Sequence, residues 1–417
     1  MHKILSVPGV WAGWVAFRLL LGYFILQNHS ARGDVAYYFY GIFGDDPTMM
    51  TEYPHAGVWP TLILGWIVGD RIDAYYIAFT VMMLLIDALF LAFLLRHHDG
   101  RSQVFLAGWF WVLFGTATGH VFVWRLDLFP GVAVAAAAAL LATRPHWAAA
   151  CLAFATTMKL WPGVLAAGLV GRFNHRGTWT RLAAFFGTLV ALCLFTVATS
   201  GFDRLISPLT YQDDRGLQVE SIPATIAMLQ GHHDPASFDV SYAASKSFEI
   251  TGPGVEFAQQ ISSVAMVVAI VFALAWAIGH FLMGGWNPRK TMVFFITIIL
   301  LLLVANKVFS PQYIVWLGPV LAVFLRQEGR NTFAWILSVL CVIAAALGTY
   351  VFPFNYEGIM NLADLAPAYA LAARNGIIVV MAVLSVVWLV RETLVFKKFR
   401  QRGRPAESEN TYQRAQA

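Results

Sequence analysis

The sequence predicts an all-α polytopic membrane protein, and three observations support that fold class. Hydrophobic residues make up 59% of the 417-residue chain. Only 12% of the residues are charged, which is about half the charged fraction of a typical soluble domain. Long apolar runs recur along the whole chain and lack the period-two alternation of membrane β-strands. We therefore expect these runs to form membrane helices.

The apolar runs predict about twelve membrane segments, an even number that places both termini on one side. Two of them, 147–158 and 160–171, are too short to cross a ~30 Å hydrocarbon core alone. We expect them to meet as a broken pair near Lys159 and Pro162, where protein or a watery cavity covers the backbone. The predicted segments are 8–28, 73–95, 104–121, 128–143, 147–158, 160–171, 182–200, 256–284, 291–306, 312–325, 332–350 and 371–393.

The charge distribution predicts the orientation of these segments. The net charge is +5, and most Lys and Arg residues fall in loops on one side of the predicted membrane, including 96–101, 171–181 and 397–404. That side is cytoplasmic by the positive-inside rule. We therefore expect a multi-pass plasma-membrane protein with both termini in the cytoplasm. The basic excess is a topology signal, so no nucleic-acid partner is predicted.

Three long connections, 29–72, 201–255 and 351–370, are expected as extracytoplasmic loops, and most acidic residues fall on their side. We predict one transmembrane domain over residues 1–395 and a basic, then polar, disordered cytoplasmic tail over 396–417. A chain with its large, acid-rich loops outside the membrane is expected to do its chemistry there.

The first long connection offers two candidate carboxylates within an aromatic segment. Asp34 follows the first helix closely and precedes Tyr37, and Glu52 precedes Tyr53. A carboxylate at the membrane surface can accept a proton from a sugar hydroxyl, and aromatic faces suit pyranose rings. The alternative is an ordinary polar loop beneath an interfacial aromatic belt.

Further charged residues lie where the predicted helices end. Arg125 and Asp127 occupy an outer helix junction, where they could be functional or form a local ion pair. Lys159 lies in the broken pair, where it could bind a lipid phosphate or snorkel to the headgroups. Arg18 and Asp87 fall at similar depths in the first two helices, and we expect them to form a structural ion pair.

The second long connection contains the polar segment 211–221, with Arg215, Gln218 and Glu220. Asp213 and Asp214 lie in the same segment. It is predicted either to contact a ligand or to be an ordinary polar loop.

A break in the stretch 303–318 is the last candidate element. Asn306 can end the incoming helix, and Pro311 suits the first turn of the outgoing one. Lys307, Gln312 and the backbone N–H groups of the new helix would then form an anion site.

No metal site is predicted. Cys151, Cys193 and Cys341 all lie in apolar runs, and the outer helices offer no His, Asp and Glu residues at ligand spacing. The cluster at 231–235 stands alone in a loop.

Taken in order, these stretches resemble glycosyltransferase family 87, a membrane family of the GT-C superfamily. The resemblance rests on the first-loop Asp34 and on "EYP" (52–54), "RLDL" (125–128), "MKLWP" (158–162), "RGLQVES" (215–221) and "NKVFSPQYIVWL" (306–317), and it runs from about residue 10 to 395. It implies the GT-C fold. It also implies inverting transfer of a sugar from a polyprenyl-phosphate donor to a glycolipid or lipoglycan acceptor on the extracytoplasmic face.

The resemblance also implies roles for residues. Asp34 matches the position of the general base, and Glu52 is a second carboxylate near the same site. Matching positions for the donor or its phosphate are Lys307, Lys159, Arg215, Gln312 and Arg125, and those for sugar or acceptor contacts are Tyr37, Tyr53, Asp127, Gln218 and Glu220. A lysine or arginine can neutralise one phosphate, so no metal or other cofactor is expected.

Two donors fit this family, polyprenyl-phosphate mannose and polyprenyl-phosphate arabinose, and mannose is the preferred interpretation. A transporter or lipid flippase would also use broken helices and charges within the membrane. Against it, the sequence shows no repeated half-chain motif, and its polar residues collect towards the outer face. A non-catalytic scaffold would not explain the repeated polar breaks.

Overall fold

The computed structural model describes residues 3–96, 101–210, 215–243 and 245–402. The described chain is helical apart from one two-stranded antiparallel sheet. It contains seven helices long and apolar enough to cross a membrane, which supports a multi-pass membrane protein. These are α1 (Val7–Gln27), α4 (Ile72–Leu95), α9 (Arg176–Ser200), α12 (Val255–Leu282), α13 (Pro288–Ala305), α15 (Thr332–Thr349) and α17 (Leu365–Arg402).

The other predicted membrane segments are shorter elements, so the described residues contain seven long apolar helices where about twelve membrane segments were predicted. The break between two of them is confirmed: one ends at Met158, Lys159 is extended, and the next begins at Trp161. Pieces of this length do not cross a membrane as single helices. They are α5 (Ser102–Ala117), α6 (His120–Val123), α7 (Leu128–Leu140), α8 (Pro145–Met158), η2 (Trp161–Leu169), η4 (Pro311–Trp316) and α14 (Gly318–Glu328).

The three long connections are largely structured, which corrects their description as loops. The apolar helix α3 was missed because its 14 residues fall short of a membrane span and include Pro60. The connections contain η1 (Ser30–Arg32), α2 (Gly33–Phe43), α3 (His55–Val68), α10 (Phe202–Thr210), α11 (Thr225–His233), η3 (Pro235–Ser237), β1 (Asp239–Tyr242), β2 (Phe248–Thr251), η5 (Tyr350–Phe354) and α16 (Tyr356–Met360).

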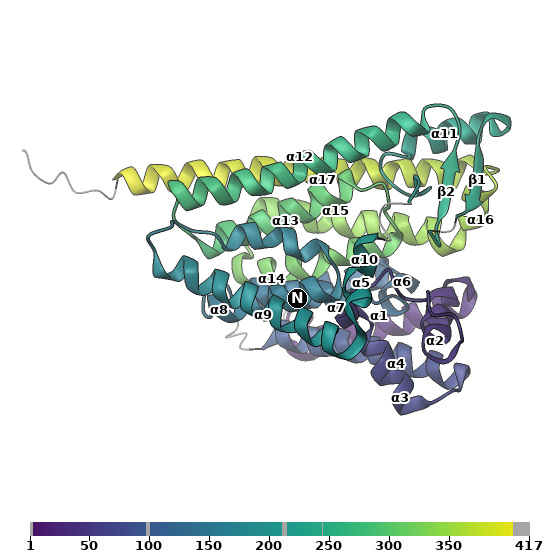
Figure 1. Cartoon of the computed structure of the whole chain (residues 1–417), viewed down its shortest axis with the longest axis horizontal. Helices are drawn as coiled ribbons and strands as arrows, with labels where there is room; N and C mark the ends of the chain where they lie inside the picture. The colour runs from purple at the N-terminus through teal and green to yellow at the C-terminus, as the bar shows by residue number, and fades with distance from the viewer. Residues whose placement is uncertain (1–2, 97–100, 211–214, 244, 403–417) are drawn as a thin grey trace, which may run out of the picture.

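The long helices α12 and α17 both run along the molecule (Figure 1), and each packs against α13. Helices α2, α11, α16 and the sheet gather at the right-hand end, whereas the yellow C-terminal end of α17 reaches the left-hand end. Helix α13 is central, because 78% of its apolar 18-residue stretch is buried inside the protein. Only 11% of the corresponding stretch of α9 is buried. An apolar helix with so little buried surface is expected to face lipid.

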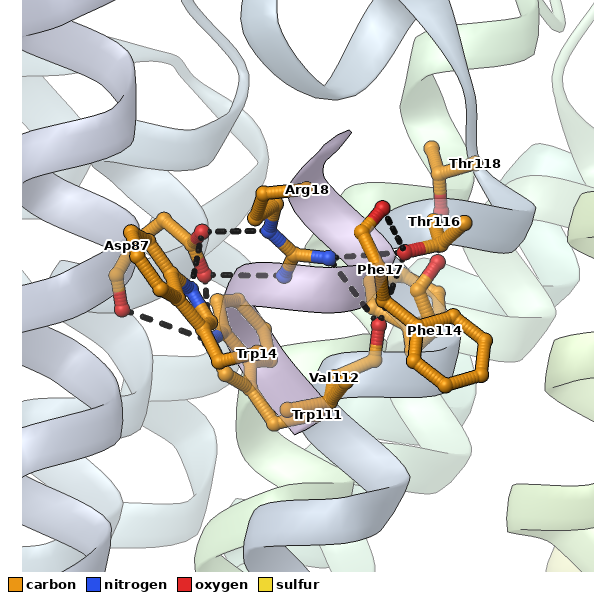
Figure 2. A network of polar contacts seen from close by, with 9 residues as sticks. All are labelled: Trp14, Phe17, Arg18, Asp87, Trp111, Val112, Phe114, Thr116 and Thr118. Carbon is orange, nitrogen blue, oxygen red and sulfur yellow. Dashed lines mark hydrogen bonds and ion pairs between the residues drawn. The ribbon is translucent and has the colours of Figure 1, made fainter. Parts of the chain in front are cut away.

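One buried polar network fastens the first helices together (Figure 2). Arg18 of α1 donates from Nε and Nη2 to the two carboxylate oxygens of Asp87 on α4, at 2.6 and 3.0 Å. The indole N–H groups of Trp14 and Trp111 donate to the same carboxylate, and Arg18 Nη1 donates to Thr116 on α5. The predicted ion pair is confirmed. Because its charges are paired and hydrogen-bonded, it can persist inside a membrane domain.

We predict that Asp87→Asn strongly destabilises the protein, because Arg18 would then be a buried charge without its counter-charge. Breaking such a pair costs about 3–5 kcal/mol. Thermal unfolding in detergent should show a clearly lower Tm. Asp73→Asn, at the exposed start of the same helix, is the control and should change stability by less than about 0.5 kcal/mol. Equal Tm values for the two variants would contradict a stabilising role for the network.

Candidate functional site

A cavity of about 770 Å³ forms where segments far apart in the sequence meet. Of the residues predicted for the site, all except Asp127 and Lys307 line it. They come from α2, the segment after it, the turn between α6 and α7, the α8–η2 break, the second long connection and the break after α13. The tertiary structure therefore brings most of the scattered candidate residues into one place.

The cavity has a charged part and an apolar part. The apolar wall consists of Val164 of η2, Met266 and Ile270 of α12, and Leu302 of α13. Helices α12 and α13 are among the seven membrane-crossing candidates. The cavity therefore continues from a group of charged residues to a wall built by helices of membrane character.

The first charged cluster contains two ion pairs, and neither is the local one considered from the sequence. Arg125 Nε pairs with Asp34, and Arg125 Nη1 donates to the carbonyl oxygen of Ala31 at 3.1 Å. Asp127 pairs instead with Lys159, whose Nζ lies 2.5 Å from Oδ1. An Arg125–Asp127 pair is therefore wrong: the turn before α7 directs the two side chains to different partners.

The Lys159 ammonium lies among aromatic rings at the cavity wall. It is 4.6 Å from the ring centroid of Tyr313, 5.1 Å from that of Trp316 and 6.0 Å from that of Tyr53. The Trp316 indole N–H donates to the Asp127 oxygen that also accepts from Lys159. The ammonium is thus held by Asp127 and the aromatic rings, and its side chain keeps 20% of its surface exposed. An exposed, oriented cation of this kind can bind an anion.

The break after α13 has the predicted ends but not the predicted helix. Asn306 ends α13, and Pro311 begins the next element. That element is the short 3-10 helix η4, so an extended row of α-helical N–H groups is not present there. Lys307 is not among the lining residues of the cavity, and its carbonyl oxygen accepts from the backbone N–H of Gln218. Gln312 does line the cavity.

Gln218 holds this break in place. Its Oε1 accepts from the backbone N–H of Phe309 at 2.7 Å, and its Nε2 donates to Ser310 Oγ at 3.3 Å. Its side chain is buried, so it acts mainly on the backbone that shapes the cavity. The sequence predicted a ligand contact for Gln218, and the structure shows that Gln218 also fixes the backbone after α13.

Glu220 belongs to a buried ion pair that the sequence did not reveal. Arg374 of α17 donates from Nη1 to Glu220 Oε2 at 2.6 Å and from Nη2 to the Glu220 carbonyl oxygen at 2.5 Å. Both side chains are almost fully buried. Arg374 lies about 150 positions from its partner in the chain, which is why no local pattern indicated the pair. Glu220 lines the cavity wall while fixing it to α17.

The second charged cluster is centred on Glu52. Its Oε2 accepts from the Tyr37 hydroxyl at 2.9 Å, and Lys246 Nζ donates to the same hydroxyl oxygen at 2.9 Å. Lys246 was missed because it lies in the turn of a hairpin without a recognisable motif. Arg215 also lines the cavity and favours the ionised form of Glu52.

The pKa values of the Asp34 and Glu52 carboxyl groups, which line the cavity, are raised. Burial raises the pKa of Asp34, and the Arg125 cation partly offsets this effect. The exposed 38% of the Asp34 side chain belongs to a residue that lines the cavity. Burial likewise raises the pKa of Glu52, opposed by its hydrogen bonds, including that from Tyr37, and by Lys246. A carboxyl group with a raised pKa is a better proton acceptor when it is ionised.

Within the described residues, no group of three or more His, Cys, Asp or Glu side chains is placed to hold a metal ion. Asp213 and Asp214 lie outside the described residues.

We predict that Arg125→Met raises the pKa of Asp34 further, because the substitution removes the cation that lowers it. Infrared difference spectra against Asp34→Asn would follow the carboxylate band of Asp34 through a pH titration. Lys246→Met is the matched control: it removes a cation that acts on Glu52, so the pKa of Glu52 should rise instead. A lower Asp34 pKa in Arg125→Met would contradict the observed pairing.

Comparisons with known protein families, with curated proteins and with solved structures give no match. The function proposed below therefore rests on the cavity, its charges and the sequence resemblance.

Proposed function

We propose that this protein is an inverting glycosyltransferase of the GT-C type, acting at the extracytoplasmic face of the plasma membrane. It transfers a sugar, preferably mannose, from a polyprenyl-phosphate donor to a glycolipid or lipoglycan acceptor. The observation that carries the proposal is one cavity that joins the carboxylates of Asp34 and Glu52 and several cations to an apolar wall that includes helices of membrane character.

The donor is an amphiphile, and the charged and apolar parts of the cavity match its phosphate and its polyprenyl chain. The polyprenyl chain is apolar and suits the wall of Val164, Met266 and Ile270. Its single phosphate requires a cation close to that wall. Lys159 meets this requirement, since it precedes η2 directly and its ammonium faces the cavity between aromatic rings.

The reaction needs a base and a stabilised leaving group. The acceptor hydroxyl oxygen forms a bond to the anomeric carbon of the donor sugar, and its proton passes to the carboxylate of Asp34. The bond between the anomeric carbon and the phosphate oxygen breaks on the opposite face, and its electron pair leaves with polyprenyl phosphate. Lys159 and Arg125 would stabilise the added negative charge on that phosphate. Positioning both substrates in one cavity lowers the entropic cost of their encounter.

Two alternatives to this proposal can be distinguished by experiment: polyprenyl-phosphate arabinose as the donor, and a lipid transporter or flippase in place of a transferase. Polyprenyl-phosphate arabinose carries the same phosphate and chain, so parallel assays with both donors decide between them. A lipid transporter or flippase would move the donor across the membrane without forming a glycosidic bond. The clustering of charged residues around one cavity, instead of along a path through the membrane, favours the transferase.

The direct test is transfer of labelled mannose from polyprenyl-phosphate mannose to octyl α-D-mannoside by the purified protein. Asp34→Asn keeps the shape of the side chain but cannot take the proton, so transfer should fall by about 10²–10⁴-fold. Asp45→Asn, an exposed acid in the same connection, should retain wild-type activity. Full activity of Asp34→Asn would remove it as the base, and Glu52 would be the next candidate.

A second prediction separates the two lysines. Lys159→Met should weaken donor use by about 30- to 800-fold, because a charge-assisted contact to a partly dehydrated phosphate contributes about 2–4 kcal/mol. Lys307→Met should change donor use by less than about threefold, since Lys307 does not line the cavity. The donor KM and the Tm are measured together, because Lys159 also pairs with Asp127. If only Lys307→Met caused a large loss of donor use, the binding site of the donor phosphate would have to be assigned to the break after α13.

A further inference from the structure

Two residues with unusual backbone conformations meet at the hydroxyl group of Tyr37. Met50 and Lys246 have φ angles of +60° and +57°, a left-handed conformation that is rare for residues other than glycine. The backbone N–H of Met50 donates to Tyr37 Oη at 2.7 Å, and Lys246 Nζ donates to it at 2.9 Å. Backbone strain of this kind tends to gather at functional sites. Among the described residues, Leu362 is the only other non-glycine residue with positive φ, and it lies just after α16.

The hydrogen bonds at Tyr37 Oη determine which partner its hydroxyl proton is donated to. Its oxygen accepts from two donors, and its one proton is directed to Glu52 Oε2 at 2.9 Å. Glu52 is therefore the acceptor in this contact. The arrangement orients one carboxylate oxygen towards Tyr37 and restricts the rotation of the carboxyl group beside the cavity.

The β-hairpin delivers Lys246 to this position. Strands β1 and β2 pair from Asp239 with Thr251 to Tyr242 with Phe248, and the turn between them carries Lys246. The hairpin is attached to an earlier part of the same long connection, because Val219 N–H donates to the Phe248 carbonyl oxygen at 3.1 Å. The position of the ammonium thus depends on a supported hairpin and not on a free loop.

The same hairpin adds aromatic surface to the cavity. Tyr242 and Phe248 have ring centroids 5.1 Å apart, and Phe248 lies 5.9 Å from Tyr356. All three rings line the cavity. Aromatic faces combined with a carboxylate suit the C–H faces and hydroxyl groups of a sugar.

We propose that Glu52 and the hairpin form the acceptor subsite, which takes a carbohydrate head group, with Tyr37 and Lys246 as positioning residues for Glu52. This inference rests on the proposed glycosyltransferase function. The first charged cluster, which contains Lys159, is adjacent to the start of η2, and η2 contributes to the apolar wall. We therefore assign the lipid-linked donor to that cluster. The second charged cluster, centred on Glu52, is built on segments outside the membrane-crossing helices, and we assign the acceptor to it.

Binding of octyl α-D-mannoside to the nanodisc-held protein, measured by isothermal titration calorimetry, tests the subsite without requiring transfer. Tyr37→Phe and Lys246→Gly should each weaken binding by about tenfold or more, the effect of losing a hydrogen bond in a charged network. Lys246→Gly should keep or raise the Tm, since glycine adopts positive φ without strain. Asp239→Asn, an exposed hairpin residue, is the control and should bind as the wild type does. Methyl α-D-mannoside should compete, which shows that the sugar is recognised.

Transfer kinetics provide the second readout. The positioning variants should raise the acceptor KM and leave the donor KM unchanged. Wild-type acceptor binding in both variants, or a change confined to the donor KM, would overturn the subsite even if transfer is observed. A wild-type protein that binds octyl mannoside through Tyr37 and Lys246 but does not transfer mannose would instead overturn the proposed function and leave the subsite standing. Absence of binding by the wild type would also overturn the subsite.

Discussion

The buried carboxylate of Asp127 connects three interruptions of the helical chain. It lies directly before α7, its Oδ1 accepts from Lys159 at the α8–η2 break, and the same oxygen accepts from Trp316 at the end of η4. Only 1% of its surface is exposed. Removing one partner of such a buried charge is costly, by about 3–5 kcal/mol. The three interruptions therefore depend on one another, and the cavity exists because they meet.

Interrupted helices would be unstable in lipid if their backbone groups lacked partners. The chain meets this requirement with side chains from distant segments. Gln218 bonds the backbone after α13, Arg374 bonds the carbonyl oxygen of Glu220, and Asn306 Oδ1 accepts from the N–H of Val308. Gln218, Glu220 and Asn306 line the cavity, so the contacts that stabilise the broken backbone also build its walls.

The carboxylates of Asp34 and Glu52 differ in their surroundings. Asp34 pairs with the Arg125 guanidinium, whereas Glu52 accepts from a neutral tyrosine hydroxyl. Burial raises the pKa of both. Two acids in one cavity with different partners can take different tasks, which is a common arrangement in sites that move protons. Under the proposed function, Asp34 takes the proton and Glu52 orients the acceptor.

The sequence by itself determined the features that follow from local chemistry and from the membrane. Hydropathy indicated the helical membrane class, and the pairing of Arg18 with Asp87 followed from the high energy of an isolated charge at that depth. The break around Lys159 followed from two apolar runs of insufficient length, and the ends of the later break followed from Asn306 and Pro311. Each of these depends on neighbouring residues or on the hydrocarbon thickness.

Only the tertiary structure decided the partners within the site. Arg125 pairs with Asp34 and not with nearby Asp127, Lys307 does not line the cavity, and Lys246 reaches Tyr37 from a hairpin about 200 positions away. Helix α3 forms although it is too short to be recognised as a membrane span. The physical reason is the same in each case: a side chain binds the partner that the packing of distant segments brings within reach, and the spacing of residues along the chain does not specify that packing.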